Sequence, residues 1–155
     1  MSVKRRGLRI TKRYPTMSVK AGVLAGATYP ADTLTDARTG AKYPDPRAGM
    51  AVAVIAAALE YGERQNHPRP FMQMTVTRER ATWTQALTTL LMRQVPVQAA
   101  LQTVGQVMKE DIRYTITEWP ADNSKAWAAK KGFDHGLIQT SHLMNSIESE
   151  IEGAT

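Results

Sequence analysis

The sequence predicts an α+β fold, with a small, mainly antiparallel sheet and two amphipathic helices packed on one of its faces. Residues 75–94 and 97–117 carry apolar side chains at helical spacing. Residues 20–28 and 147–152 alternate between apolar and polar side chains, which is typical of strands. A loop joins the first strands and both helices precede the last strand, and this order favours an antiparallel sheet with the helices on one face.

The length of 155 residues suits one folded domain with a terminal extension. We expect a basic N-terminal arm over residues 1–18 and a single α+β domain over residues 19–155. Because the chain has no cysteine, a disulfide framework, a thiolate nucleophile and a zinc–thiolate site are excluded. No apolar run approaches the roughly 20 residues that span a bilayer, and no signal-peptide pattern follows the basic start. We therefore expect no membrane partner and a cytosolic site of synthesis and assembly.

The early strands are separated by an irregular segment. Residues 29–49 contain three prolines and two glycines, and we expect a long inter-strand loop with a mobile tip. The apolar run at residues 50–57 suits either a strand or a helix, because its periodicity does not decide between them. We favour a strand that turns at residues 58–62, followed by a loop over residues 63–70.

Two helices are predicted next, separated by Pro96, which ends the first and suits the first turn of the second. The apolar face of the first comprises Trp83, Leu87, Leu90 and Leu91. The apolar stripe of the second comprises Val97, Leu101, Val104, Met108 and Ile112. Residues 120–136 are predicted to form another loop. In residues 147–152, isoleucine and serine alternate with glutamate, which predicts a half-buried last strand.

The positive charge of the chain is concentrated at its N-terminus. The first twenty residues hold seven cations and no acid, against a net charge of +6, so the remainder carries a net charge of −1. The cations of this arm that we expect to contact a partner are Lys4, Arg5, Arg6, Arg9, Lys12 and Arg13. Such an arm suits contact with phosphate backbones, a solvated tail, or docking on an acidic neighbour in an assembly.

The sequence contains no recognisable constellation for catalysis. There is no Gly-rich phosphate-binding loop, no His-Glu-x-x-His helix and no Gly-x-Ser-x-Gly elbow. His135 and His142, with Asp134 nearby, are the best candidates for a metal, but solvent-facing loop histidines explain them more simply. We therefore predict a non-enzymatic protein with no cofactor and no metal.

Two segments, 59–72 and 131–147, carry more specific patterns. In the first, an acid, an aromatic residue and a glycine precede a short loop, an Arg-Pro-Phe element and a helix; these residues are Glu60, Tyr61, Gly62, Arg69, Pro70 and Phe71. The second begins with Lys131-Gly132 and continues with Leu137, Ile138, Thr140, Leu143, Ser146 and Ile147. With these residues the chain resembles the tail-completion, or neck, proteins of tailed bacteriophages. It departs from them at Gly136, Gln139 and Ser141, where proline, aspartate and glycine are common.

The resemblance implies a structural virion protein at the head–tail junction. Such proteins form rings, commonly sixfold, through which DNA passes. The implied partners are further copies of the chain and neighbouring head-completion or connector, tail-terminator or tail-tube proteins, with assembly in the host bacterial cytoplasm. We expect the arm to contact a neighbouring protein of the neck, and contact with packaged DNA is the second choice. The resemblance gives the motif residues structural roles.

Two other functions stay open. A nucleic-acid-binding module with a basic arm predicts salt-sensitive binding to DNA. A small hydrolase built around His135 and His142 predicts a bound metal.

Overall fold

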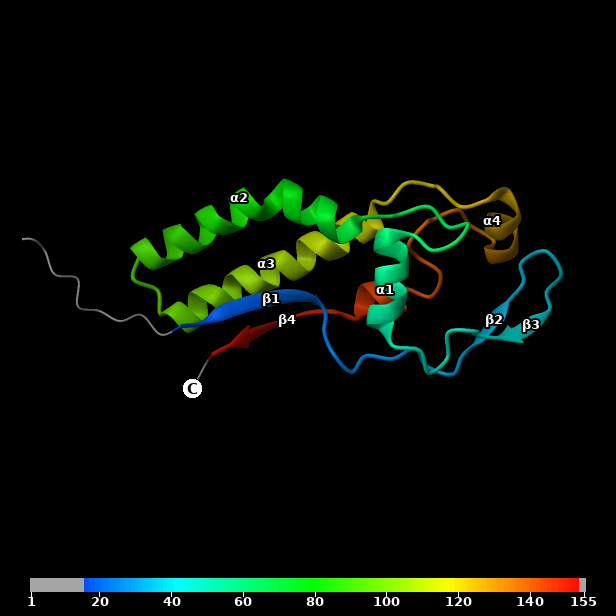
Figure 1. The fold of residues 1–155 in the computed structure, drawn as a ribbon, viewed down its shortest axis with the longest axis horizontal. Coiled ribbons are helices and arrows are strands. Elements are labelled where there is room, and N and C mark those ends of the chain that lie inside the picture. Colours follow the sequence, from blue (N-terminus) through cyan, green and yellow to red (C-terminus); the bar gives the residue numbers. More distant parts are fainter. Residues whose placement is uncertain (1–15, 154–155) are drawn as a thin grey trace, which may run out of the picture.

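The computed structural model describes residues 16–153, and these residues confirm the α+β class (Figure 1). The elements in chain order are β1 (Ser18–Val23), β2 (Thr33–Thr35), β3 (Lys42–Pro44), α1 (Val52–Tyr61), α2 (Phe71–Met92), α3 (Val97–Thr117), α4 (Lys125–Lys131), α5 (His142–Asn145) and β4 (Ile147–Glu152). The arm cations Lys4, Arg5, Arg6, Arg9, Lys12 and Arg13 lie outside the described residues.

The main sheet pairs β1 with β4 in antiparallel register, from Ser18 opposite Glu152 to Val23 opposite Ile147. β4 confirms the predicted last strand, whereas β1 begins two residues earlier and ends five residues earlier than predicted. α3 lies against both strands (Figure 1). A Cβ at Gly105 of α3 would lie only 2.7 Å from the side chain of Val19. Gly105 therefore allows the helix to approach the sheet closely.

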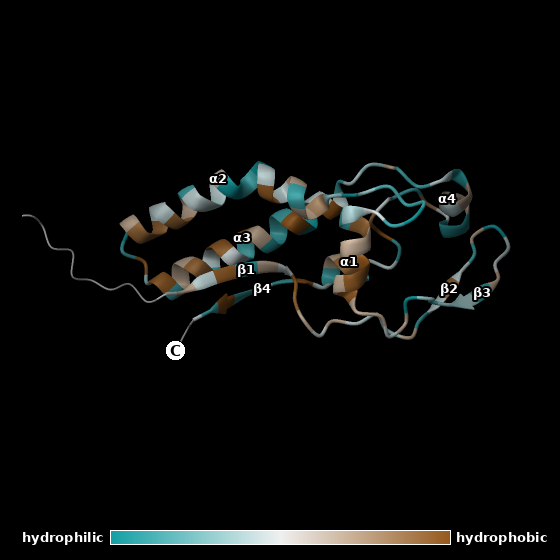
Figure 2. Cartoon of the chain, viewed as in Figure 1, coloured by the Kyte–Doolittle hydropathy of each residue, from teal (hydrophilic) through white to brown (hydrophobic). Residues whose placement is uncertain are grey.

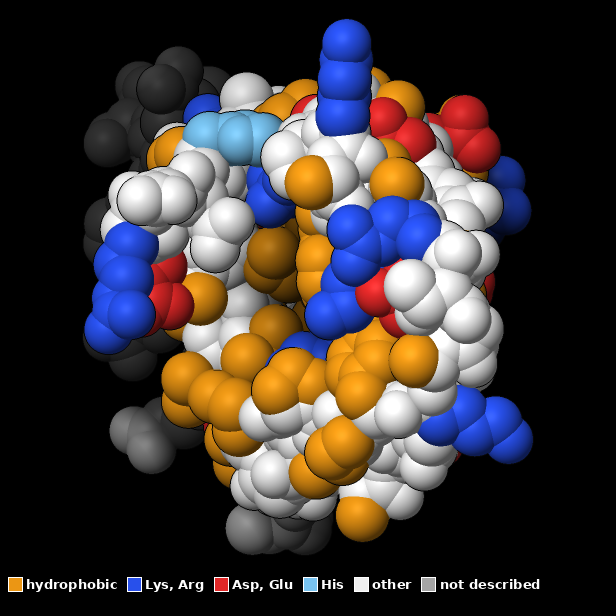
Figure 3. All heavy atoms as spheres, turned by 90° about the vertical axis from the view of Figure 1, so that its right-hand side faces the viewer, with side chains coloured by type: hydrophobic (Ala, Val, Ile, Leu, Met, Phe, Trp, Pro, Cys, Tyr) orange, Lys and Arg blue, Asp and Glu red, His pale blue; other side chains and the backbone are white. Residues whose placement is uncertain are grey.

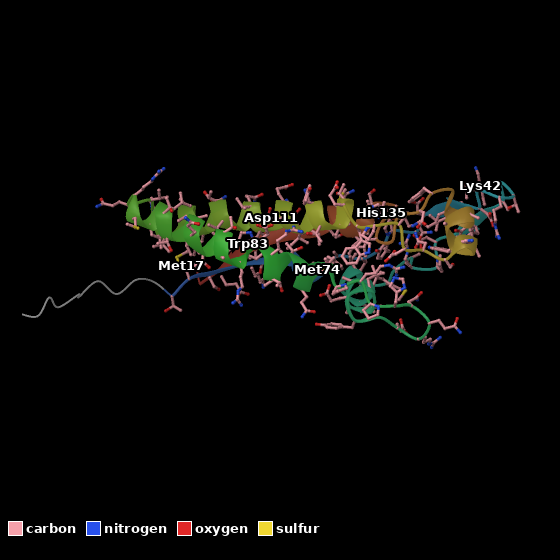
Figure 4. All side chains as sticks on the ribbon, turned by 90° about the horizontal axis from the view of Figure 1, so that it is seen from above. Met17, Lys42, Met74, Trp83, Asp111 and His135 are labelled. Carbon is pink, nitrogen blue, oxygen red and sulfur yellow. The ribbon has the colours of Figure 1, made fainter. Side chains whose placement is uncertain are left out.

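The two long helices are confirmed and lie on the same side of the sheet (Figure 1). α2 packs along α3, and Trp83 of α2 donates a hydrogen bond of 2.7 Å to the Asp111 carboxylate of α3 (Figure 4). Leu101, Val104 and Ile112 of the predicted α3 stripe are buried. Leu91, which was predicted to lie on the buried face of α2, is instead 40% exposed, because α2 packs mainly on α3 and only a narrow stripe of it is covered.

The prediction of a strand at residues 50–57 was wrong, because this run forms α1. Four of the six residues from 53 to 58 are alanine, the residue with the highest helix propensity, and the helix is hydrophobic over most of its length (Figure 2). Tyr61 and Gly62 therefore end a helix rather than a strand. Gly62 has a φ of 76°, and a Cβ there would lie 2.8 Å from the carbonyl oxygen of Asn66.

The prediction of an irregular loop at residues 29–49 was also wrong, because β2 and β3 form a short antiparallel hairpin there. Two Asp-x-Arg turns stabilise it, one between β2 and β3 and one directly after β3. In each, the aspartate accepts hydrogen bonds from both the backbone amide and the guanidinium of the arginine two residues later, in the pairs Asp36–Arg38 and Asp45–Arg47. Such side chain-to-backbone bonds fix turns in a segment without a core of its own.

Residues 120–136 contain a helix, α4, where only a loop was predicted. The Ser124 hydroxyl accepts a hydrogen bond from the Trp127 amide at the start of α4, and Gly132 ends it with a φ of 85° in the left-handed region. These capping residues are the signal that the sequence analysis missed. No helix in the part of the chain that the structure describes is long and apolar enough to cross a membrane.

The main core lies where α1, the start of α2, the end of α3 and the C-terminal segment meet. Its buried side chains are Tyr29, Val52, Phe71, Ile112, Ile116, Leu137, Leu143 and Ile147. Phe71 is fully buried in this core. Because Phe71 comes from the first motif segment and Leu137, Leu143 and Ile147 come from the second, both segments contribute to the same core.

Candidate functional site

The two motif segments border one cleft of about 510 Å³ at the end of the molecule that carries α4 and the β2–β3 hairpin (Figure 3). The first segment supplies Leu59, Gln65, Asn66, His67 and Arg69. The second supplies Lys131 and residues 136–143. The remaining lining residues are Tyr29, Arg47, Ile55, Asp122, Asn123, Ser124 and Trp127. The cleft is thus built from segments that are far apart in the sequence.

Glu60 stabilises the side of the cleft that the first motif segment forms, because it joins the end of α1 to the start of α2. Its side chain is buried at the end of α1, and its two carboxylate oxygens accept hydrogen bonds of 2.9 Å from the backbone amides of Met72 and Gln73. These amides belong to the first turn of α2, where no partner within the helix exists and where negative charge is favourable. Glu60 therefore caps α2 from another helix, which explains why α2 begins four residues before its predicted start.

Arg69 and Asp122 form the ion pair at the centre of this side of the cleft. The Arg69 side chain is 8% exposed, and its Nε lies 2.9 Å from both carboxylate oxygens of Asp122. His67 and Trp119 donate further hydrogen bonds to the same carboxylate, of 2.9 and 3.0 Å. Burial raises the pKa of Asp122, but the hydrogen bonds from His67, Trp119 and Arg69 outweigh it and the pKa is lowered.

Gly136 joins the second segment to this pair. A Cβ at this position would overlap the Asp122 carboxylate and lie 2.9 Å from Arg69 Nε. Glycine at position 136 therefore allows the close approach of Asp122 and Arg69.

His135 and His142 bind backbone groups. His135 Nδ1 accepts hydrogen bonds from the amides of Leu137 and Ile138, and its Nε2 donates to the Thr117 carbonyl at the end of α3. These contacts match the tautomer that carries a proton on Nε2. His142 donates to the Thr28 carbonyl, and its ring centroid lies 4.9 Å from that of Tyr29. Within residues 16–153 no three histidine, aspartate or glutamate side chains are grouped as metal ligands.

No match emerges when the chain is compared with protein-family models, curated proteins and solved structures.

Three cations face this cleft. Arg47 is paired with Asp45 and lies 4.5 Å over the Tyr29 ring, and Arg69 is paired with Asp122. The Lys131 ammonium donates a 2.7 Å hydrogen bond to the His135 carbonyl and lies 4.6 Å over the Phe133 ring. Among its polar residues, the lining also has five aliphatic side chains: Ile55, Leu59, Leu137, Ile138 and Leu143. The arrangement suits the binding of an anionic group that carries apolar surface.

The sequence analysis located part of this cleft. It singled out Arg69, Gly132, Leu137, Ile138 and Thr140, which lie in or beside the cleft. Leu137 is buried and Ile138 half-buried, whereas Tyr61 is 78% exposed and points away from the core. Asp122, Tyr29 and Arg47 also line the cleft and were not predicted from the sequence. The Asp-x-Arg repeat was a signal for Arg47, but no sequence pattern indicates that Asp122 meets Arg69.

Proposed function

We propose that the protein is a structural virion protein of a tailed phage that forms a ring at the head–tail junction. The resemblance of residues 59–72 and 131–147 to neck proteins motivates the proposal. The two segments share one core and one cleft, which supports treating them as parts of a single unit.

The observation that carries the ring is the two-stranded β1–β4 sheet. Within the described part of the chain, no third strand pairs with the outer edge of either β1 or β4. Each strand has six residues, and neither contains proline. Unpaired edges of this kind are templates for pairing with another chain.

A ring uses these edges without changing the fold. Rotation about an axis along the strands keeps strand direction, so β1 of one copy runs antiparallel to β4 of the next copy, as it does to its own β4. The contact is heterologous and closes on itself by rotation. Lys20 already contacts Glu150 and Glu152 at 2.8 and 2.6 Å. In the ring, the acids of β4 would face a Lys20 on each side.

Native mass spectrometry of the purified protein, followed by electron microscopy of neck complexes, tests the proposal. Rings, or a defined neck layer, are the expected result. Hydrogen exchange would locate the interface, because assembly should slow the exchange of amides in β1 and β4. Amides at the C-terminal end of α2, where the residues are exposed, should exchange at the same rate before and after assembly and serve as the internal control. A monomer that is absent from particles would refute the structural role. If that monomer bound DNA with strong salt dependence, the basic N-terminal cluster would instead mark a nucleic-acid-binding module.

A further inference from the structure

Lys131 differs from the other cations of the cleft because it has no acidic partner. Arg47 and Arg69 each contact a carboxylate, whereas no carboxylate in residues 16–153 lies within 4.0 Å of the Lys131 ammonium. An ammonium group has three donors. One is used on the His135 carbonyl, so two remain for another acceptor.

The surroundings of Lys131 favour an incoming anion. Burial lowers the pKa of Lys131, and the nearby charge of Arg69 and Arg47 lowers it further, against the opposing effect of Asp134 and Asp122. The charged lysine is therefore less stable here than in water. A carboxylate placed against it would replace lost hydration and offset the repulsion from the two arginines.

The rest of the cleft specifies what carries that carboxylate. Ile55, Leu59, Leu137 and Ile138 contribute aliphatic side chains to the cleft, and Trp127 contributes an aromatic one. Residues 139–141 also line the cleft, and their backbone amides donate no hydrogen bond within the described part of the chain. An extended peptide matches all three features, because its main chain can accept from these amides while its apolar and acidic side chains alternate. A nucleic acid would leave these aliphatic side chains without an apolar partner.

We propose that this cleft binds an extended acidic and aliphatic peptide segment of a partner protein, with a carboxylate of that segment on Lys131. The inference does not depend on the ring: it concerns the end of the molecule that carries α4, whereas the ring uses the edges of β1 and β4. In a neck, the cleft would receive a segment of an adjoining protein.

Fluorescence anisotropy with a labelled peptide of alternating glutamate and leucine, blocked at both ends, tests the proposal on the full chain. We expect saturable binding with a dissociation constant below about 1 mM. Lys131→Met should weaken it at least about tenfold, since a hydrogen bond to a charged group is lost. Lys131→Arg should keep binding within about threefold of the wild type, because it retains the charge. Lys125→Met is the matched control, because it removes the same charge from α4 at a position that does not line the cleft.

Two further peptides distinguish the contribution of the carboxylates from that of the apolar side chains. A peptide with glutamine in place of glutamate tests the carboxylate, and one with serine in place of leucine tests the apolar lining; both should bind at least about tenfold more weakly. Circular dichroism must show that Lys131→Met is folded, and Lys131→Arg keeps the test valid if it is not. The proposal is overturned if the wild type does not bind the peptide, if Lys125→Met and Lys131→Met weaken it equally, or if a short oligonucleotide binds the cleft in its place.

Discussion

Substituting Asp122→Asn tests whether the Arg69–Asp122 pair holds the two motif segments together. The substitution keeps the shape of the side chain and removes its charge. The Arg69 side chain, 8% exposed, would then lack a counter-ion, and three donors that now bind the carboxylate would share one amide oxygen. Leaving a buried charge unpaired costs about 3–5 kcal/mol. Because Asp122 is 21% exposed and water can reach it, we expect about 2–3 kcal/mol here.

Urea unfolding followed by tryptophan fluorescence measures this loss. With a slope of about 2 kcal/mol/M, typical of a small domain, the midpoint should fall by about 1–1.5 M. Glu118→Gln is the control: it removes a nearby negative charge from an exposed side chain that has no ion pair among the described residues, so the midpoint should change little.

A double-mutant cycle measures the interaction energy between Arg69 and Asp122. Arg69→Met removes the cation, and the double variant should be less destabilised than the sum of the two single variants by about 1 kcal/mol or more, because neither charge is then left alone. If the effects add within about 0.3 kcal/mol, or if Asp122→Asn costs less than about 0.5 kcal/mol, the pair does not hold the segments together and the wall of the cleft must rest on apolar packing alone.

Three further predictions concern other parts of the molecule. Glu60→Ala should lower the free energy of unfolding by about 1–2 kcal/mol through loss of the α2 cap, and the α2 amides at Met72 and Gln73 should exchange faster with solvent. Acid should destabilise the fold as the pH falls from about 4 towards 2: the side-chain and backbone hydrogen bonds of Arg38 lower the pKa of Asp36 to about 2, so its contribution is present above the unfolded-state pKa of 3.8 and is lost as pH falls through the folded value. A titration by circular dichroism should show this, and Asp36→Asn should flatten the curve. Gly105→Val should lower the melting temperature by about 4–8 °C through collision with Val19, whereas Gln102→Val, exposed on the same helix, should change it by less than about 2 °C.

The long helices could be predicted because their signal is local and repeated. The stripe of Leu101, Val104 and Ile112 spans three turns of α3, and each turn adds independent support for the helix. The last strand was predicted for a similar reason, since its alternating pattern matches one buried and one exposed face. In both cases burial of one face produces a periodic pattern that is visible without the rest of the fold.

The other elements depend on information that periodicity does not carry. The run that forms α1 is apolar at almost every position, so its pattern fits both structures, and only the propensity of alanine favours the helix. The hairpin and α4 are fixed by single polar residues, such as Asp36, Asp45 and Ser124, which act through one or two hydrogen bonds each. These residues are informative only when their spacing to a backbone amide is considered.

The contacts that build the candidate site join residues far apart in the sequence, and no local pattern predicts them. Glu60 was identified only as part of a motif and Asp122 was not identified at all, yet each satisfies groups that lie in other elements. Glu60 binds the amides of α2, and Asp122 binds the guanidinium of Arg69. The positions of Glu60 and Asp122 determine where the first motif segment lies. Gly136 of the second segment must remain a glycine for Asp122 and Arg69 to pair beside it. It follows that the motif residues of this chain act as a unit with residues outside the motifs. A substitution at Asp122 should therefore disturb the cleft as strongly as one at Arg69, although only Arg69 belongs to the pattern that suggested the function.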